Sequence, residues 1–151
     1  MSRSEDTKAS EAEARDTVEV VLLPSTSELQ KLAEAVEEFA ASHGLSAKVM
    51  NTVALVLEEA VTNVLMYAFE GMPEESGRVS VRLQRTPEAV CATIVDNGHP
   101  FDPTGARNEA PDPNAEEKLG GWGIKLIRNL ANEVRYRRIG NVNQLELVLY
   151  T

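Results

Sequence analysis

The sequence contains a single cysteine, Cys91, and few aromatic residues, which make up 5% of its 151 residues. One cysteine cannot form an internal disulfide or a cysteine-rich zinc site, so the chain needs no oxidising compartment. Residues 1–16 are charged or small and hold no apolar signal segment, and no stretch approaches the roughly 20 apolar residues of a membrane span. These absences predict a cytoplasmic protein that is neither anchored nor exported.

Basic residues are scarce relative to acidic ones. The chain has 15 Lys and Arg against 24 Asp and Glu, which gives a formal net charge of −9. This balance argues against nucleic acid or an anionic membrane as a partner, because both attract proteins through positive charge. The length corresponds to one domain, with enough chain to bury a core.

After a polar tail of residues 1–16, the hydrophobic pattern predicts one domain over residues 17–151 with five strands and three helices. The predicted strands are Thr17–Leu23, Arg78–Gln84, Ala89–Val95, Glu133–Ile139 and Gln144–Tyr150, and the predicted helices run from Ser25 or Ser27 to Gly44, from Ser46 to about Phe69, and from Trp122 to Ala131. Residues 96–121 form a long connection rich in Gly and Pro. This order favours an α+β, two-layer sandwich with a mixed, mostly antiparallel sheet covered on one face by three helices.

Two polar residues interrupt the apolar pattern of the long central helix. Glu59 and Asn63 are four residues apart and share a helical face, beside the stripe through Ala60 and Val64. A carboxylate can take a proton from a nucleophile, and an amide oxygen suits Mg²⁺ bound beside phosphates. The alternative is that both side chains only face solvent, where glutamate is usually found.

An acidic turn follows the strand Ala89–Val95. In Asp96-Asn97-Gly98, a fixed hydrogen-bond acceptor stands beside a glycine that a flat ligand can approach closely. Such an acceptor suits an exocyclic amino group. An ordinary Asp-Asn-Gly turn is the alternative.

Glycines open the last predicted helix, in Leu119-Gly120-Gly121-Trp122-Gly123. Free N–H groups at a helix start bind phosphate, and glycine lets the backbone come close. The segment is neither a P-loop, because the Lys-Ser/Thr pair is missing, nor a dinucleotide fingerprint, because Leu126 occupies the place of the third glycine. Six basic residues and one acidic residue lie between Lys118 and Gly140, which favours an anionic ligand or an acidic partner surface. A flexible hinge is the alternative for the glycines.

Other reactive side chains form no recognisable site. Neither His43 nor His99 has a second ligand at metal spacing, and the sequence offers no nucleophile paired with a histidine. Cys91 lies inside an apolar strand, which predicts a position in the core.

Together, the three segments resemble one family, in whose order they occur across residues 17–150. EEAVTN resembles the N-box, VDNGHPFDP the G1 box and GGWGIKLIRNLANEV the G2 box of the histidine-kinase and gyrase type of ATPase, the GHKL or Bergerat fold. Within this type, the chain is similar to the stand-alone anti-sigma-factor serine kinases of bacteria. Two positions depart from the pattern: Tyr67 stands where a His is common, and Gln144 stands where the last strand commonly has Thr. These departures concern the catalytic rate more than ATP binding.

The resemblance implies roles for individual residues. Glu59 would be the general base that deprotonates a serine of the protein substrate, Asn63 would ligate Mg²⁺, and Asp96 would accept from the adenine amino group. The residues implied to bind the nucleotide are Asn63, Asp96, Gly98, Gly120, Gly121, Trp122 and Gly123, and residues 104–119 would form the ATP lid.

The resemblance also implies a function. The chain would be an ATP- and Mg²⁺-dependent serine/threonine-protein kinase and anti-sigma factor that phosphorylates a STAS-type anti-anti-sigma partner in a partner-switching pathway, as a homodimer. A sigma factor would be a further partner. The alternative is a nucleotide-gated binding module that sequesters a sigma factor or another regulator without kinase activity.

Overall fold

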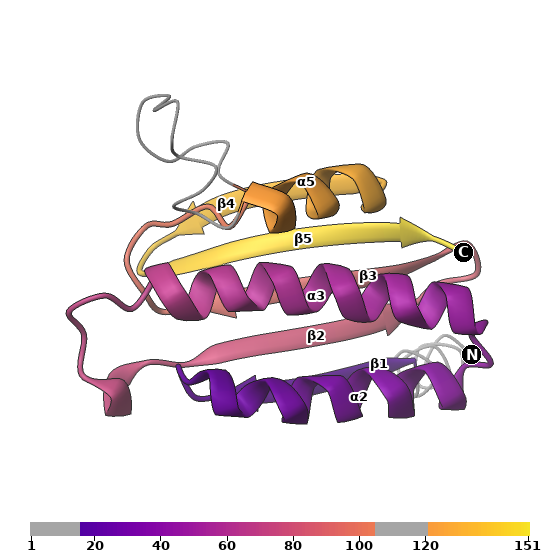
Figure 1. Ribbon diagram of the computed structural model, residues 1–151, viewed down its shortest axis with the longest axis horizontal. Coiled ribbons are helices and arrows are strands. Elements are labelled where there is room, and N and C mark those ends of the chain that lie inside the picture. Colours follow the sequence, from indigo (N-terminus) through magenta and orange to yellow (C-terminus); the bar gives the residue numbers. More distant parts are fainter. Residues whose placement is uncertain (1–15, 105–120) are drawn as a thin grey trace, which may run out of the picture.

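The computed structural model describes residues 16–104 and 121–151, which form an antiparallel sheet with helices on one face (Figure 1). The elements are β1 (Thr17–Leu22), the 3-10 turn η1 (Thr26–Glu28), α2 (Leu29–Ser42), α3 (Ala47–Tyr67), the 3-10 turn η2 (Glu74–Ser76), β2 (Val79–Arg85), β3 (Ala89–Asp96), α5 (Gly121–Leu130), β4 (Glu133–Ile139) and β5 (Val142–Tyr150). The predicted two-layer α+β sandwich is confirmed. The predicted tail lies outside the described residues except for Asp16, whose carbonyl accepts a hydrogen bond from Arg85 N at 2.9 Å.

The strand order in the sheet is β1-β2-β3-β5-β4, so β3 is the central strand. Every pairing between the described strands is antiparallel, whereas a mixed sheet was expected. Hairpins force antiparallel pairing of β2 with β3 and of β4 with β5, and the longer connections from β1 to β2 and from β3 to β5 also bring their strands together antiparallel. The register sets Asp96 at the end of β3 opposite Asn143 at the start of β5.

The hairpin between β4 and β5 is tighter than the sequence suggested. Ile139 pairs with Val142, which leaves Gly140 and Asn141 as the turn, and Gly140 has a φ of 58°. A glycine at positive φ permits a two-residue hairpin. β5 therefore begins at Val142, two residues before the predicted start at Gln144, and Asn143 becomes part of the strand.

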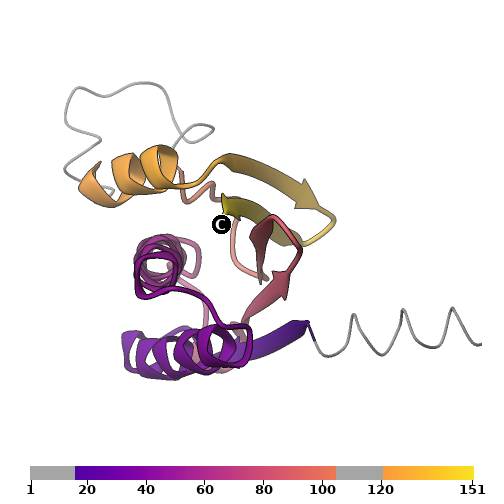
Figure 2. The ribbon, with the colours of Figure 1, turned by 90° about the vertical axis from the view of Figure 1, so that its right-hand side faces the viewer.

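The core lies between the sheet and the three described helices, which all cover the same face (Figure 2). α3 is the central helix, with Val56, Leu57 and Ala60 fully buried. An 18-residue window of α3 has a mean hydropathy of 1.4, so by length and composition this helix could cross a membrane, contrary to the expectation from the sequence. We interpret it as the core helix of the sandwich, because its buried side chains belong to the same cluster as those of the sheet.

The other face of the sheet is not covered by any described element. Along β3, Val90 and Ala92 are buried beneath the helices, and Cys91 between them points to the opposite face and is partly exposed. The prediction of a core position for Cys91 was therefore wrong. The strand alternation, rather than the apolar composition, determines which side of the sheet each side chain occupies.

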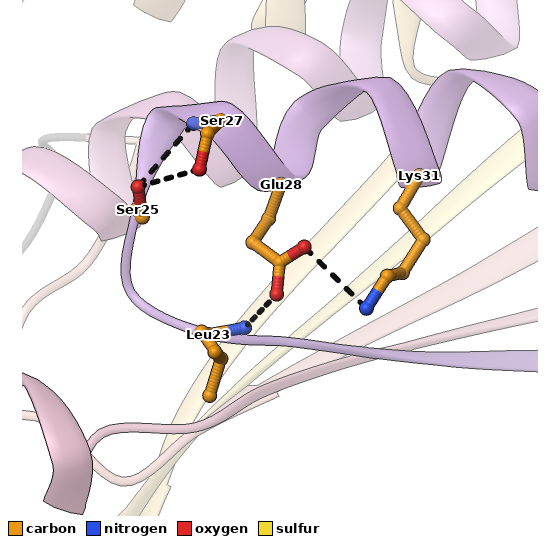
Figure 3. Close-up of polar contacts among 5 residues, drawn as sticks. All are labelled: Leu23, Ser25, Ser27, Glu28 and Lys31. Carbon is orange, nitrogen blue, oxygen red and sulfur yellow. Dashed lines mark hydrogen bonds and ion pairs between the residues drawn. The ribbon is translucent and has the colours of Figure 1, made fainter.

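Short polar contacts fix the turn from β1 into α2 (Figure 3). Oγ of Ser25 accepts from the backbone N–H of Ser27 at 3.4 Å, and Oε1 of Glu28 accepts from Leu23 N at 3.1 Å. Glu28 also forms an ion pair of 3.4 Å with Lys31. The two hydrogen bonds give partners to the backbone N–H groups of Leu23 and Ser27, which both precede α2. The hydrogen bond from Leu23, with the charge of Lys31, lowers the pKa of Glu28.

Candidate functional site

The N-box and G1 residues lie at one end of the molecule. The C-terminal end of α3, the end of β3 and the start of β5 meet there, on the left of Figure 1. Two hydrogen bonds attach the loop after β3 to α3: His99 N donates to Ala68 O at 2.7 Å, and Nδ2 of Asn63 donates to Pro103 O at 3.2 Å. The loop therefore runs along the last turns of α3, which brings the two sequence motifs together.

Glu59 and Asn63 differ in burial, although they lie one turn apart on α3. Asn63 is only 4% exposed, whereas Glu59 is partly exposed at the surface. The idea that both side chains simply face solvent is therefore wrong for Asn63. Its amide nitrogen is used by Pro103 O, and its amide oxygen is the atom that a hard cation prefers.

Magnesium needs few protein ligands when it arrives with a nucleotide, because phosphates and waters complete its shell. In residues 16–104 and 121–151, no group of three or more His, Cys, Asp and Glu side chains could hold a metal ion. A dedicated metal cage is thus absent from the described chain. The single amide oxygen of Asn63 fits a magnesium ion that is bound chiefly by phosphates.

Asp96 is a buried carboxylate at the end of the central strand, with 2% of its surface exposed. Its Oδ1 accepts two hydrogen bonds, from Gly98 N at 2.9 Å and from Nδ2 of Asn143 at 2.8 Å. Burial raises the pKa of Asp96, and the two hydrogen bonds and the charge of Arg138 oppose this rise. A buried acceptor of this kind favours a ligand that donates hydrogen bonds.

Gly98 is required by close packing within the protein. A Cβ atom at this position would lie 2.5 Å from the carbonyl oxygen of Ala68 and 2.8 Å from its Cβ. The sequence suggested that this glycine lets a flat ligand approach. The structure gives a different reason, which is that the loop and the end of α3 touch through their backbones.

Asn143 is the polar residue of the site that the sequence did not reveal. Its side chain is 2% exposed, faces Asp96 across β3 and β5, and contacts the loop after β3. Gln144 was expected to occupy the position where the last strand of the family commonly has Thr. It lies on the uncovered face, where its Nε2 donates to Glu146 at 2.7 Å. The missed signal was Gly140-Asn141, a two-residue turn after which β5 begins at Val142, two residues earlier than predicted.

The start of α5 lies at the same end of the molecule as these residues (Figure 1). Gly121, Trp122 and Gly123 form its first residues, and the helix packs against α3. The backbone N–H groups of this first turn point out of the helix and suit an anion. Gly120 and residues 105–119 of the predicted lid lie outside the described residues.

The predicted cluster of basic residues is divided between the two faces of the sheet. Nη1 of Arg138 donates to Gly98 O at 2.7 Å, so this arginine reaches the site. Its neighbour Arg137 pairs with Glu146 at 3.0 Å on the uncovered face. Of these two adjacent arginines, only Arg138 contributes positive charge near Asp96.

Tyr67, at the position where a His is common in the N-box, is half-buried at the end of α3. Its ring lies against that of Phe101, with 5.5 Å between the ring centroids and an angle of 33° between the planes. This contact adds an apolar attachment between α3 and the loop after β3. The tyrosine therefore has a packing role in this chain.

Comparisons with known proteins agree with the fold and the order of the motifs. Residues 23–149 match the family described as "Histidine kinase-like ATPase domain". The serine/threonine-protein kinase BtrW of Bordetella bronchiseptica is 29% identical over 107 residues, which cover 70% of this chain and 74% of that protein. The serine-protein kinase RsbW of Listeria innocua is 28% identical over 119 residues, which cover 75% of this chain and 74% of that protein.

A solved structure shows the same fold at low sequence identity. The structure of the RsbU and RsbW domains of Rv1364c from Mycobacterium tuberculosis superimposes with a TM-score of 0.60 and 14% identity. The match covers 89% of this chain and 33% of that longer chain. The likeness concerns the fold alone.

Proposed function

Because the chain belongs to the histidine kinase-like ATPase domain family, we propose that it is an ATP-dependent serine protein kinase and anti-sigma regulator that phosphorylates a STAS-type anti-anti-sigma protein. The names of the relatives from Bordetella and Listeria support the kinase activity. The resemblance to the anti-sigma-factor kinases supports the partner, the further interaction with a sigma factor, the cytoplasmic location and the homodimer.

ATP binding is supported by the buried carboxylate of Asp96, which is the observation that carries the proposal. A buried carboxylate is costly to retain even with two hydrogen bonds to one of its oxygens, so its presence at the end of the central strand favours a ligand that donates to it. The 6-amino group of adenine supplies such a donor. Gly98, whose N–H holds Oδ1 of Asp96, keeps that carboxylate in place.

The triphosphate would extend from Asp96 towards the start of α5. Gly120, Gly121 and Gly123 would allow the helix N-terminus to approach the phosphates, and Trp122 lies among these glycines in the sequence. The amide oxygen of Asn63 would ligate the magnesium ion, which neutralises charge on the phosphates during transfer. This arrangement is supported by the shared location of α3, β3 and the start of α5 (Figure 1).

Glu59 is the proposed general base. It would accept the proton of the substrate serine while the serine oxygen attacks the γ-phosphorus and the bond from the γ-phosphorus to the bridging oxygen breaks, with ADP as the leaving group. Its partial exposure is compatible with access for a serine on another protein. Glu58 precedes it on α3, turned away by about 100°, and would not reach the same serine.

The experiment incubates the chain with ATP labelled at the γ-phosphate and a purified STAS-type protein. The proposal expects label on a serine of that protein, and loss of the label when Asn63 is replaced by Ala. If the chain binds ATP and the partner but transfers no label, the alternative of a nucleotide-gated binding module is correct and the kinase proposal is wrong.

A further inference from the structure

The side chain of Asn143 joins three separate segments of the site. Its Nδ2 donates to Oδ1 of Asp96 at 2.8 Å and to His99 O at 2.7 Å. Its Oδ1 accepts from Phe101 N at 3.2 Å and from the hydroxyl of Tyr136 at 2.6 Å. One buried amide therefore connects the end of β3, the loop after it and the edge strand β4.

The backbone partners of Asn143 determine how its amide group is oriented. The N–H of Phe101 can only donate a hydrogen bond, so it requires the amide oxygen, and the carbonyl of His99 can only accept, so it requires the amide nitrogen. If the amide were flipped, its nitrogen would face the N–H of Phe101 and its oxygen would face the carbonyl oxygen of His99, so neither hydrogen bond could form. The nitrogen of Asn143 must therefore face Asp96.

This orientation has a consequence for the carboxylate. Both the Asn143 nitrogen and the Gly98 N–H donate to Oδ1 of Asp96, and neither of these bonds uses Oδ2. Oδ2 is therefore the oxygen that Asp96 offers to a ligand. An amino group on carbon 6 of a purine can donate to it, whereas the carbonyl oxygen that guanine carries there would be repelled.

Tyr136 makes this arrangement depend on the edge strand of the sheet. It lies on β4, opposite Leu145 of β5, and its hydroxyl reaches across to the oxygen of Asn143. A phenol hydroxyl can donate or accept, but the partner here is an oxygen with only acceptor capacity, so Tyr136 donates. The hydroxyl thus reinforces the same orientation of Asn143 that the backbone requires.

We propose that Asn143, held by Tyr136, is a positioning residue that directs Oδ2 of Asp96 towards the purine ring and sets the preference of the site for a 6-aminopurine nucleotide. The inference rests on the proposed ATP site. It assigns to Asn143 no contact with the reacting phosphates, so the residue acts on recognition of the base.

The test compares dissociation constants for ATP and for purine riboside triphosphate, which lacks only the 6-amino group. The dissociation constant of purine riboside triphosphate divided by that of ATP measures the contribution of the amino group, independently of the phosphates and the sugar. For Asn143→Ala, we expect this ratio to fall roughly tenfold. Without Asn143, the carboxylate of Asp96 is no longer fixed, and the hydrogen bond that it accepts from the 6-amino group is weakened. Gln144→Ala is the matched control on the opposite face of β5, and its ratio should equal that of the wild type.

A purely structural role for Asn143 would weaken both nucleotides equally and leave the ratio unchanged, which would overturn the inference. Tyr136→Phe provides a second reading if Asn143→Ala does not fold, because it removes one hydroxyl and keeps the amide. Its ratio should fall about threefold, and an unchanged ratio in a folded Tyr136→Phe protein contradicts the role of Tyr136.

If the wild-type chain binds neither nucleotide, the proposed ATP site itself is wrong. If it binds both and the variants keep its ratio, only the inference about Asn143 is wrong.

Discussion

Gly98 lies so close to Ala68 that a Cβ atom on residue 98 would stand 2.5 Å from the Ala68 carbonyl oxygen. The same carbonyl oxygen accepts a hydrogen bond from His99 N at 2.7 Å. Direct contact between the backbones of residues 98 and 68 thus holds Asp96 in position relative to Glu59 and Asn63 on α3. The loop and α3 can approach this closely only because residue 98 has no side chain between the two backbones.

Gly98→Ala should separate the loop from α3. A methyl group at this distance from a backbone carbonyl forces one of the two segments to move, so we expect the free energy of unfolding to fall by about 1–3 kcal/mol. Denaturant unfolding measures this change. Pro100→Ala, at an exposed position of the same loop, is the control and should cost less than about 1 kcal/mol. Equal stability of Gly98→Ala and the wild type would show that the close contact does not constrain the loop.

Asp96→Asn should separate stability from nucleotide binding. Burial raises the pKa of Asp96 above its ordinary value of 3.8, so the folded state binds the proton more tightly than the unfolded state does. Stability is therefore lost as the pH rises from the ordinary to the raised value, and this loss persists at neutral pH. The asparagine keeps an acceptor for Gly98 and Asn143 without the buried charge.

For Asp96→Asn at neutral pH, we accordingly expect a midpoint of thermal unfolding equal to or above that of the wild type. ATP affinity should fall by at least tenfold, because the amide nitrogen would face the adenine amino group as a second donor. Thermal unfolding and nucleotide titration check the two parts. A variant that keeps its ATP affinity would remove Asp96 from the proposed binding site.

Acidification should weaken recognition of the adenine amino group. The raised pKa means that Asp96 takes up its proton at a higher pH than an exposed aspartate, and the protonated carboxyl is a poorer acceptor. As the pH is lowered, the ratio of the affinity for ATP to that for purine riboside triphosphate should therefore begin to decline before the pH reaches 3.8. Measuring both nucleotides at each pH cancels the titration of the phosphates. A ratio that stays constant down to the ordinary value would contradict the raised pKa.

Glu28→Gln should lower stability at neutral pH but not in acid. The hydrogen bond from Leu23 and the charge of Lys31 lower the pKa of Glu28, so its contribution is present above the ordinary pKa of glutamate and disappears as the pH falls through the lowered value. Thermal unfolding of the wild type and of Glu28→Gln should thus converge at acidic pH. Glu37→Gln, at an exposed position on α2, should unfold like the wild type at both pH values. A difference between wild type and Glu28→Gln that persists unchanged in acid would contradict this account.

The helices were predictable because local signals and burial agree. Ser46 caps α3 through a 3.2 Å bond from Val49 N, and the apolar period that follows is the face buried in the core. The bounds of α3 were therefore predicted to within two residues. The same agreement between alternation and burial located β2, β3 and β4.

The candidate site was only partly predictable, because its geometry depends on register. Glu59, Asn63 and Asp96 belong to segments with local patterns, and the sequence identifies them directly. Asn143 acquires its place only when β5 pairs with β3 and brings it opposite Asp96. The Gly140-Asn141 turn marks where β5 begins, but no local pattern in the sequence gives the register of β5 against β3.

The account depends most directly on the rate at which Glu59→Gln transfers the γ-phosphate of ATP to the serine of a STAS-type protein. The substitution keeps the shape of the side chain and removes its capacity to take a proton, so we expect transfer to slow at least about 100-fold with unchanged ATP affinity. Glu58→Gln, the neighbouring carboxylate on α3, should transfer phosphate at the wild-type rate. Transfer by Glu59→Gln at the wild-type rate would contradict the proposed role of Glu59.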